Sequence, residues 1–324
     1  MNGLMSLHQS INPPIHQSIN PLIHFKKRIA SLLLALVWLA LLTPAPHLPA
    51  RESPAPQTKH CLWKIQGQTN AVFLFGSIHF LKKDFYPLDP PIEAAYRQSQ
   101  MVVFETDLEE MLSPKTQVKM LQMGSCPAGE TIQKQVAGET YAALTNDLRR
   151  LGLPLAMMDP FKPWMAAILL VGIELQKLGF EPDQGVDKYF HTKAQRDHKS
   201  LAGLETLEFQ LGLFNSFSRA ESEAMLLESL TEISRFKGTL LDLTAAWKSG
   251  DTQKIEGLVL EDLRKFPQVY KKLMLERNVT WAGKISELLT QGKNAFVVVG
   301  AGHLAGKDSL VALLKKKGFR IEQQ

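Results

Sequence analysis

Three short, uninterrupted apolar segments lie far apart in this sequence of 324 residues: Ala71–Phe75, Met101–Phe104 and Phe296–Val299. Each is rich in Val or Phe and is followed by a glycine or an acidic residue. Segments of this kind are typical of β-strands that are buried on both faces of a sheet. Because two of them lie early in the chain and one lies near its end, we expect a sheet that draws strands from both ends.

Other segments have weaker strand signals. The segment CLWKIQG at residues 61–67 is a short strand candidate that precedes a turn, and the tail FRIEQ after Gly318 is predicted as a final edge strand. Leu155–Met158, which precedes an Asp-Pro pair, is a further candidate. The order and direction of these strands cannot be read from the pattern.

Between about residues 107 and 292 the sequence has mainly amphipathic helical patterns. Breaks between helices are predicted at Ser249–Asp251 and at Phe266-Pro267. We expect an α/β (α+β) fold, with a small central sheet, a large helical insertion and a single domain over residues 61–324. Two buried helix faces are predicted from the spacing of apolar residues, namely Leu226, Leu227, Leu230 and Ile233, and Trp281, Ile285, Leu288 and Leu289.

Residues 25–50 have the layout of a secretory signal. A basic cluster precedes the apolar run Ile29–Leu42, small residues and prolines follow it, and cleavage is expected near Ala50. The run is shorter than the roughly 20 residues that a membrane-spanning helix needs. We therefore expect a periplasmic or secreted protein. The alternative is a protein anchored in the membrane by residues 29–42.

Two segments flank this signal. Residues 1–24 contain a nearly exact repeat of His8–Ile15 as His16–Ile23, and we interpret them as an upstream segment that need not be translated. Residues 51–60 are polar and rich in proline, which predicts a linker.

Charge and cysteine content narrow the possible functions. The formal net charge is +5, and part of it belongs to the basic cluster of the signal segment, so nothing calls for nucleic acid as a partner.

Cys61 and Cys126 could form one disulfide in an oxidising compartment, and the sequence leaves their pairing open. Neither belongs to a C-x-x-C pair, which argues against a zinc site built on them.

Two matched segments carry the main functional signal. Ala71–His79 and Ala295–His303 align without a gap, and each consists of an apolar strand, a glycine, two short or apolar residues and a histidine. Glycine lets the chain turn, and each histidine then stands at a strand end, where open sheets commonly build sites. A single G-x-x-H is more often structural than functional. The matched pair favours one shared divalent-metal site that includes His79 and His303.

Glu105 supplies a third potential ligand, because it directly follows the apolar segment Met101–Phe104. Two imidazoles and one carboxylate are a common ligand set for a catalytic divalent ion, with positions left open for water. The alternative is that Glu105 caps the helix that follows. Asp107 is the better candidate for that cap, which leaves Glu105 for the site.

Three other charged residues stand in defined contexts. Asp187 and Glu205 could orient a histidine or act as a general base, and each could instead be an ordinary acid at a helix start. Arg277, with the adjacent Asn278, could hold a substrate or one of these acids, and the alternative is a surface ion pair. Three other histidines of the predicted mature region are not assigned to the site: His60 is predicted to lie in the linker, and His191 and His198 are predicted to be solvated.

The chain resembles the TraB/GumN (TraB/PrgY/GumN) family, whose wider group includes the Tiki metalloproteases and is related to erythromycin-esterase-like folds. The resemblance spans residues 62–310, and its most specific motifs are LAGLETLEFQ and VVVGAGHLAG, supported by FLFGSIH, VVFE, GVDKYF and LERNVTWAGKI. It implies a metal-dependent, hydrolase-like site at His79, Glu105 and His303. Asp187, Glu205 and Arg277 fall on the family's other polar motif positions.

We therefore expect an exported metallohydrolase, of peptidase type, that acts on a peptide or small molecule. The donor set suits zinc, manganese or cobalt, and the resemblance to the Tiki proteins implies manganese or cobalt more than zinc. Other interpretations remain: a non-enzymatic peptide or pheromone binding protein, two purely structural strand ends, or hydrolysis with a histidine base and no metal. Ser77 is a weak nucleophile candidate, because it lacks the G-x-S-x-G turn.

Overall fold

The computed structural model describes residues 59–232 and 236–324. The predicted upstream repeat, the predicted signal at residues 25–50 and residues 51–58 of the predicted linker lie outside these ranges. Within them, no helix is both long enough and apolar enough to cross a membrane.

The described strands form one mixed sheet in the order β4-β3-β5-β2-β1-β6. The central strand β5 pairs in parallel with both β2 and β3, and β4 pairs in parallel with β3. β1 is antiparallel to β2 and to β6. Strands from both ends of the chain therefore alternate within one sheet, as predicted. The strands are β1 (Leu62–Gln66), β2 (Ala71–Ser77), β3 (Met101–Phe104), β4 (Ser200–Gly203), β5 (Ala295–Gly300) and β6 (Ile321–Gln323).

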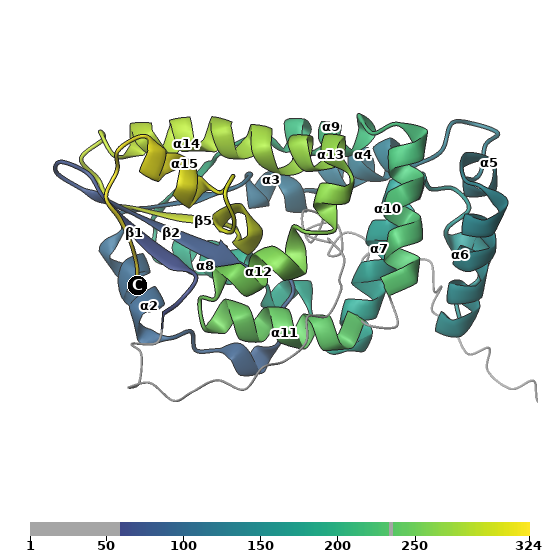
Figure 1. Ribbon diagram of the computed structural model, residues 1–324, viewed down its shortest axis with the longest axis horizontal. Coiled ribbons are helices and arrows are strands. Elements are labelled where there is room, and N and C mark those ends of the chain that lie inside the picture. The colour runs from purple at the N-terminus through teal and green to yellow at the C-terminus, as the bar shows by residue number, and fades with distance from the viewer. Residues whose placement is uncertain (1–58, 233–235) are drawn as a thin grey trace, which may run out of the picture.

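Helices cover this sheet and extend beyond one end of it. Figure 1 shows α14 and α15 above the sheet, α2 and α8 below it, and α5, α6, α7 and α10 farther away. The α-helices are α2 (Pro90–Gln98), α3 (Leu108–Leu112), α4 (Pro114–Gly124), α5 (Ile132–Gln135), α6 (Gly138–Leu151), α7 (Pro163–Lys177), α8 (Val186–Arg196), α9 (Leu207–Asn215), α10 (Arg219–Glu232), α11 (Phe236–Lys248), α12 (Thr252–Val259), α13 (Pro267–Tyr270), α14 (Glu276–Leu288) and α15 (Leu310–Lys316).

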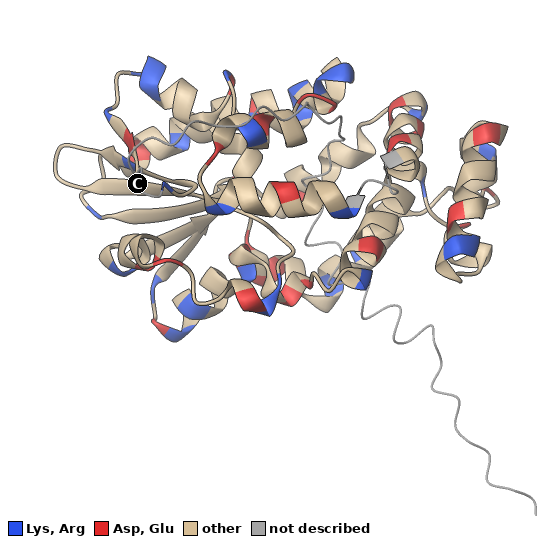
Figure 2. Cartoon of the chain, turned by 60° about the horizontal axis from the view of Figure 1, so that its bottom comes forward, with Lys and Arg blue, Asp and Glu red and all other residues tan. Residues whose placement is uncertain are grey.

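Several shorter helical turns join these elements. In Figure 2, basic and acidic residues are interspersed along the helices, whereas the strands are almost uncharged. The short turns are 3₁₀-helical except for η6, which is π-helical, and they are η2 (Lys83–Phe85), η3 (Leu155–Met157), η4 (Pro182–Gln184), η5 (Leu263–Lys265), η6 (Lys271–Leu275) and η7 (Ala301–Leu304).

An aromatic cluster fixes α8 against the sheet. Phe75 of β2 and Phe296 of β5 stack with their ring centroids 5.7 Å apart, and Phe190 of α8 packs 4.8 Å from Phe296. Each fully buried phenylalanine contributes roughly 1.5–3 kcal/mol of hydrophobic stabilisation. Because Phe190 lies one turn after Asp187, this packing also fixes the start of α8 near the carboxyl ends of the strands.

Close packing, rather than a sharp turn, explains the glycine of the first G-x-x-H segment. A Cβ on Gly76 would lie 3.1 Å from the backbone of Ala301 and 3.2 Å from the Cys61 side chain. Gly300, the glycine of the second segment, has an ordinary φ of −53°. The prediction that glycine is there to let the chain turn is therefore wrong at Gly76, which lies inside β2 and is constrained by its contact with η7.

Most strand predictions are confirmed, with two differences. Leu155–Met157 forms a 3₁₀ turn rather than a strand, because its hydrogen bonds run locally, from Met158 N–H to the Leu155 carbonyl. β4 was not predicted. It is a four-residue edge strand whose residues are all exposed, so it lacks the apolar pattern that reveals a buried strand.

The helix predictions agree with the described residues except at Leu227. Trp281, Ile285, Leu288 and Leu289 are buried, and of the other predicted face Leu226 and Leu230 are buried while Leu227 is 37% exposed. Ile233 lies outside the described residues. The predicted breaks separate α11 from α12 and η5 from α13.

Candidate active site

The predicted site residues gather at the carboxyl ends of four parallel strands. Glu105 directly follows β3, and His79 and Glu205 lie two residues beyond the ends of β2 and β4. His303 lies in η7, which directly follows β5. Parallel strands end at the same edge of a sheet, and ligand sites in open α/β sheets commonly form there. The topology therefore brings together four residues that are distant in the sequence.

His79 is held by Asp187, which lies in the first turn of α8. Its Nδ1 atom is 2.7 Å from one Asp187 carboxylate oxygen, and the Ser77 hydroxyl donates to the other oxygen at 2.9 Å. Burial lowers the pKa of His79, but the charge and hydrogen bond of Asp187 raise it by more, so it lies above the ordinary histidine value. Nε2 is buried and has no hydrogen-bond partner among the described residues.

Gly185 allows α8 to approach His79 this closely. A Cβ at Gly185 would lie 2.2 Å from the backbone carbonyl oxygen of His79, a distance that no side chain can adopt. The Val186 N–H also donates to the Ile78 carbonyl at 3.0 Å. The sequence Gly185-Val186-Asp187 therefore anchors the start of α8 on the His79 backbone and brings its carboxylate to the ring.

His303 is fully enclosed. Its Nδ1 lies 2.6 Å from Oδ1 of Asn278, and its Nε2 lies 3.2 Å from Nη1 of Arg277. Because an amide oxygen only accepts and a guanidinium only donates, Nδ1 carries the proton and Nε2 accepts. The ring also packs 4.5 Å from that of Trp281. Burial and the charge of Arg277 hold the pKa of His303 well below its ordinary value, so the imidazole is neutral.

Glu105 is buried and ionised. One carboxylate oxygen accepts from the Gly300 N–H at 2.8 Å, and the other accepts from Arg277 at 2.7 Å and from the Gln210 amide at 3.2 Å. Burial raises the pKa of Glu105, but Arg277 and the two histidines lower it by more. Asp107 caps α3 by accepting from two backbone N–H groups. The prediction that Asp107 rather than Glu105 serves as the cap is confirmed.

Arg277 joins the two glutamates. Its side chain is fully buried, donates to both oxygens of Glu205 at 2.8–3.1 Å and bonds to Glu105. The Trp281 indole N–H also donates to Glu205 at 3.1 Å. Burial raises the pKa of Glu205, against the opposing effect of Arg277. Of the predicted roles, binding to the acids is observed, and the alternative of a surface ion pair is wrong.

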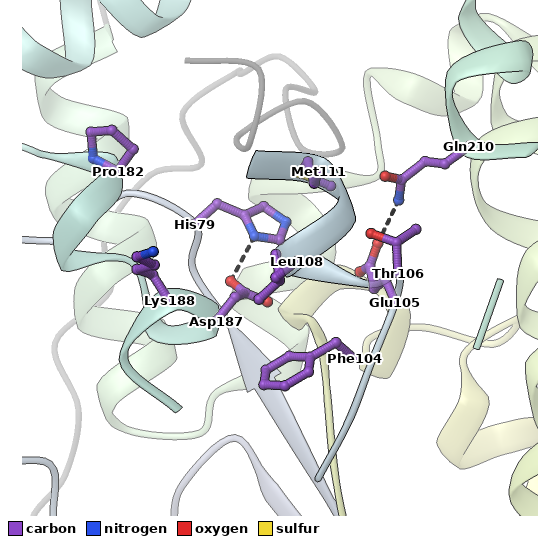
Figure 3. Close-up of a pocket in the computed structure, with 10 residues that line it drawn as sticks. All are labelled: His79, Phe104, Glu105, Thr106, Leu108, Met111, Pro182, Asp187, Lys188 and Gln210. Carbon is purple, nitrogen blue, oxygen red and sulfur yellow. Dashed lines mark hydrogen bonds and ion pairs between the residues drawn. The ribbon is translucent and has the colours of Figure 1, made fainter. Parts of the chain in front are cut away.

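A small cavity of about 30 Å³ lies between these elements. Figure 3 shows Asp187, Lys188 and Pro182 on one side, Glu105 and Gln210 on the other, and His79 between them. The space is enough for an ion or a few water molecules and is too small for a whole peptide residue. The residues that line it are His79, Phe104, Glu105, Thr106, Leu108, Met111, Pro182, Asp187, Lys188 and Gln210.

The three predicted metal ligands are close to one another but do not form a complete ligand set. His303 Nε2 lies 3.9 Å from Glu105, and Arg277 bonds to both of them. In the part of the chain that the structure describes, no three His, Cys, Asp or Glu side chains are arranged to hold a metal ion. The guanidinium contacts Nε2 of His303, the nitrogen through which this ring would bind a metal.

Comparison with known proteins identifies the group to which this fold and site belong. The model of the TraB/PrgY/gumN family matches residues 61–323. The chain belongs to the TraB/PrgY/gumN family.

The proteins to which this chain is similar include some that are named as metalloproteases. The uncharacterized protein YbaP of Escherichia coli (strain K12) is 24% identical over 242 residues, which cover 75% of this chain and 87% of YbaP. The Metalloprotease TIKI homolog of Nematostella vectensis is 20% identical over a match that covers 81% of this chain and 66% of that protein. Metalloprotease TIKI1 of Danio rerio is 21% identical over a match that covers 90% of this chain and 70% of that protein. No solved structure matches the chain significantly.

Two histidines of this TraB/PrgY/gumN chain lie elsewhere than predicted. His191 is buried on α8 rather than solvated, because its ring packs against Phe104, with the centroids 5.8 Å apart. His60 is also buried, and its backbone N–H donates to the carbonyl of Gln324, so the folded region includes the end of the predicted linker. His198 is exposed, as predicted.

Both cysteines of this family member are free thiols. Cys61 is buried and Cys126 is partly exposed. Burial raises the pKa of Cys61 far above that of an ordinary thiol. The pairing that the sequence left open is not present in this structure.

The sequence pointed to Asn278 only as the neighbour of Arg277, and it did not point to Gln210. Asn278 directly follows Arg277, and this pairing of two hydrogen-bonding side chains at the start of a helix was its only signal. Gln210 lies on α9, one turn beyond the Thr206 cap, and its pattern is that of an ordinary helix. Both act by holding another site residue, which spacing alone does not reveal.

Proposed function

We propose that this chain is a metal-dependent hydrolase that cleaves peptide bonds, with its reaction centre at the cavity between His79 and Glu105. The observation that carries the proposal is the buried Nε2 of His79, which has no partner among the described residues and belongs to a ring that lines the same cavity as the ionised Glu105. The relatives named as metalloproteases support the assignment.

Two donors at the cavity, Nε2 of His79 and the carboxylate of Glu105, are of the kinds that a divalent ion binds. A carboxylate that binds one histidine nitrogen and leaves the other nitrogen free is the usual arrangement around metal-binding histidines, and Asp187 has this relation to His79. The nitrogen and carboxylate donors suit manganese, cobalt or zinc. His303 would act as a third ligand only after displacement of the Arg277 Nη1 that lies 3.2 Å from its Nε2.

The chain's own residues would prepare the reaction. In the neutral form of His79, Asp187 keeps the proton on Nδ1 and leaves Nε2 with its lone pair. Gly300, Gln210 and Arg277 hold Glu105 as a carboxylate with fixed oxygens. When bound, a divalent ion supplies Lewis acidity toward a carbonyl group and toward water. The apolar side chains of Phe104, Leu108 and Met111 exclude bulk water from the cavity.

A second candidate is hydrolysis without a metal, in which His79 is the general base. The specific observation in its favour is that Arg277 already holds His303, while Asp187 and His79 form a carboxylate–imidazole pair with a free nitrogen. A base within hydrogen-bond reach of water contributes about 10²–10⁴-fold to such a reaction. In this case His303 would be purely structural.

Metal content and peptide cleavage should be measured on the same preparations. The full chain would be loaded with manganese, cobalt or zinc, and bound metal would be counted by elemental mass spectrometry before and after chelation. The metal proposal predicts one ion per chain, cleavage of some members of a peptide library, and loss of both in His79→Ala and Glu105→Gln. His198→Ala, which changes an exposed histidine, is the matched control.

Each candidate predicts a different result in this experiment. Cleavage that persists after complete metal removal would support the histidine-base alternative. Retention of peptides without any cleavage would indicate a binding protein and would refute both hydrolase proposals. Export through residues 25–50 also remains a proposal, and N-terminal sequencing of the protein recovered outside the cytoplasm would test it.

A further inference from the structure

Lys188 is the cation of the site that has no fixed counter-charge. It follows Asp187 on α8, lines the cavity, and forms no hydrogen bond or ion pair with any of the described residues. Lys188 is partly exposed, whereas the buried cation of the site, Arg277, is saturated by Glu105 and Glu205. Lys193, on the same helix, bonds to Glu93 and lies over the Tyr96 ring at 4.8 Å. Lys188 thus differs from its neighbours in being available to a ligand.

The surroundings of Lys188 would strengthen its interaction with an anion. Phe104, Leu108, Met111 and Pro182 form apolar walls of the cavity and are all buried. An ammonium group beside apolar walls interacts with a carboxylate more strongly than one in bulk water, because the local dielectric constant is lower.

The positions of the charges also define where an anionic group could bind. In Figure 3, Lys188 and Glu105 lie on opposite sides of His79. A carboxylate near Glu105 would be repelled, whereas one near Lys188 would meet a cation. Asp187 also lies on this side, but its two oxygens are already bonded, to the Ser77 hydroxyl and to His79. Since only a small group enters the cavity, the reacting carbonyl would lie near His79 and the substrate's carboxylate would remain on the Lys188 side.

We propose that Lys188 binds a carboxylate of the substrate, so that the enzyme selects peptides with a carboxylate next to the scissile bond. This inference rests on the proposed hydrolase function. The carboxylate can be the C-terminus of the peptide or the side chain of Asp or Glu, because both offer the same acceptor oxygens.

The test compares matched peptides on the full chain loaded with manganese or cobalt. One pair ends in a free carboxylate or in an amide, and a second pair has Glu or Gln beside the scissile bond. We expect kcat/KM to be about tenfold to a hundredfold higher for one acidic member of these pairs, which is the effect of a charge-assisted hydrogen bond. The pair that shows the preference identifies the source of the carboxylate.

Variants of Lys188 separate recognition from chemistry. Lys188→Gln should raise KM, leave kcat within about threefold and abolish the preference for the acidic peptide, and Lys188→Arg should restore it in part. Lys115→Gln, which removes an exposed lysine of α4, should leave the preference unchanged. Equal rates for acidic and neutral peptides, or a preference that survives Lys188→Gln, would overturn the proposal.

Equilibrium binding keeps this proposal distinct from the proposed function. If no peptide is cleaved, the hydrolase proposal fails, and calorimetric binding of the same uncleaved peptides then decides the role of Lys188. Tighter binding of the acidic peptides to the wild-type chain than to Lys188→Gln would support a carboxylate site. Equal binding to both would refute it.

Discussion

The two G-x-x-H segments have matching sequences but different environments. His79 has one nitrogen held by Asp187 and the other without a partner among the described residues, on a ring that lines the cavity. His303 has both nitrogens bonded, to Asn278 and Arg277, and is completely buried. The pKa of His79 is raised, whereas that of His303 is lowered. A repeated motif can therefore give one histidine available for chemistry and one built into the support.

The elements that follow each strand account for this difference. After β2 the chain continues as an irregular loop, and α8 meets that loop through Gly185. After β5 the chain enters η7, and the first turns of α14 lie against it through Arg277 and Asn278. The strands also pair with an offset of one residue, since Gly76 faces Val299 rather than Gly300. The sequence alignment is therefore not the spatial alignment.

The largest expected effect is a loss of activity in His79→Ala. If His79 is the available histidine, kcat/KM for a cleaved peptide should fall at least about a hundredfold, while the free energy of unfolding changes by no more than about 2 kcal/mol. Peptide cleavage and urea unfolding on the same preparations would check this. A variant that keeps near wild-type activity would remove the distinction between the two segments.

The next effect concerns stability and the His303 side of the comparison. Arg277→Met leaves two buried carboxylates without their cation, and we expect a loss of about 3–5 kcal/mol in the free energy of unfolding. Glu208→Gln, which breaks an exposed ion pair with Lys119, should cost less than about 1 kcal/mol. Urea unfolding measures both, and similar small losses would contradict a central role for the buried Arg277.

The two histidines should respond to pH with opposite signs. The pKa of His303 is lowered in the folded state. Its contribution to the free energy of unfolding is therefore fully present above the unfolded pKa of about 6.5. This contribution is lost as pH falls below that value, by roughly 1.4 kcal/mol per pH unit. His79 has a raised pKa, so its contribution is present below about 6.5 and is lost as pH rises through the folded value.

Single variants would isolate these two contributions. Unfolding in urea at several pH values between 5 and 8 should show that His303→Gln reduces the loss of stability at low pH relative to the wild-type chain. His79→Gln should reduce the loss of stability that the wild-type chain shows as pH rises through the folded-state pKa of His79. If both variants changed the pH dependence of stability in the same direction, the pKa values of His79 and His303 would not be shifted in opposite directions.

The smallest effect is expected at His191, a buried histidine outside both segments. Neither ring nitrogen has a partner among the described residues, and burial lowers its pKa. Replacing an unpaired buried polar group by an apolar one of similar size is close to neutral, so His191→Leu should change the free energy of unfolding by about 1 kcal/mol or less. A thermal or urea unfolding curve would detect a larger loss, which would point to an unrecognised partner.

The sequence predicted the parts of the molecule that depend on local pattern. Uninterrupted apolar runs located β2, β3 and β5, and the residues after them located His79, Glu105 and His303 at one edge of the sheet. The exposed strand β4 carries no such pattern and was missed. His191 was misassigned because neighbouring polar residues suggest solvent, whereas burial depends on which face of α8 packs against Phe104.

The finer geometry of the site depends on contacts between distant elements. Arg277 and Glu105 are separated by 172 positions, and no local spacing indicates that the guanidinium bonds to both Glu105 and His303. The sequence therefore identified which side chains converge but not which of them are already satisfied. That distinction separates a ligand available to a metal from a residue that supports it.

The position of β5 in the middle of the sheet has a consequence for the order of events during synthesis. β2 and β3 are synthesised early, but they cannot join one sheet until residues 295–300 form β5 between them. Glu105 likewise waits for the Gly300 N–H and for Arg277. A growing chain therefore has no reaction centre, and the proposed peptidase would remain inactive toward its surroundings until residues 295–303 have been synthesised.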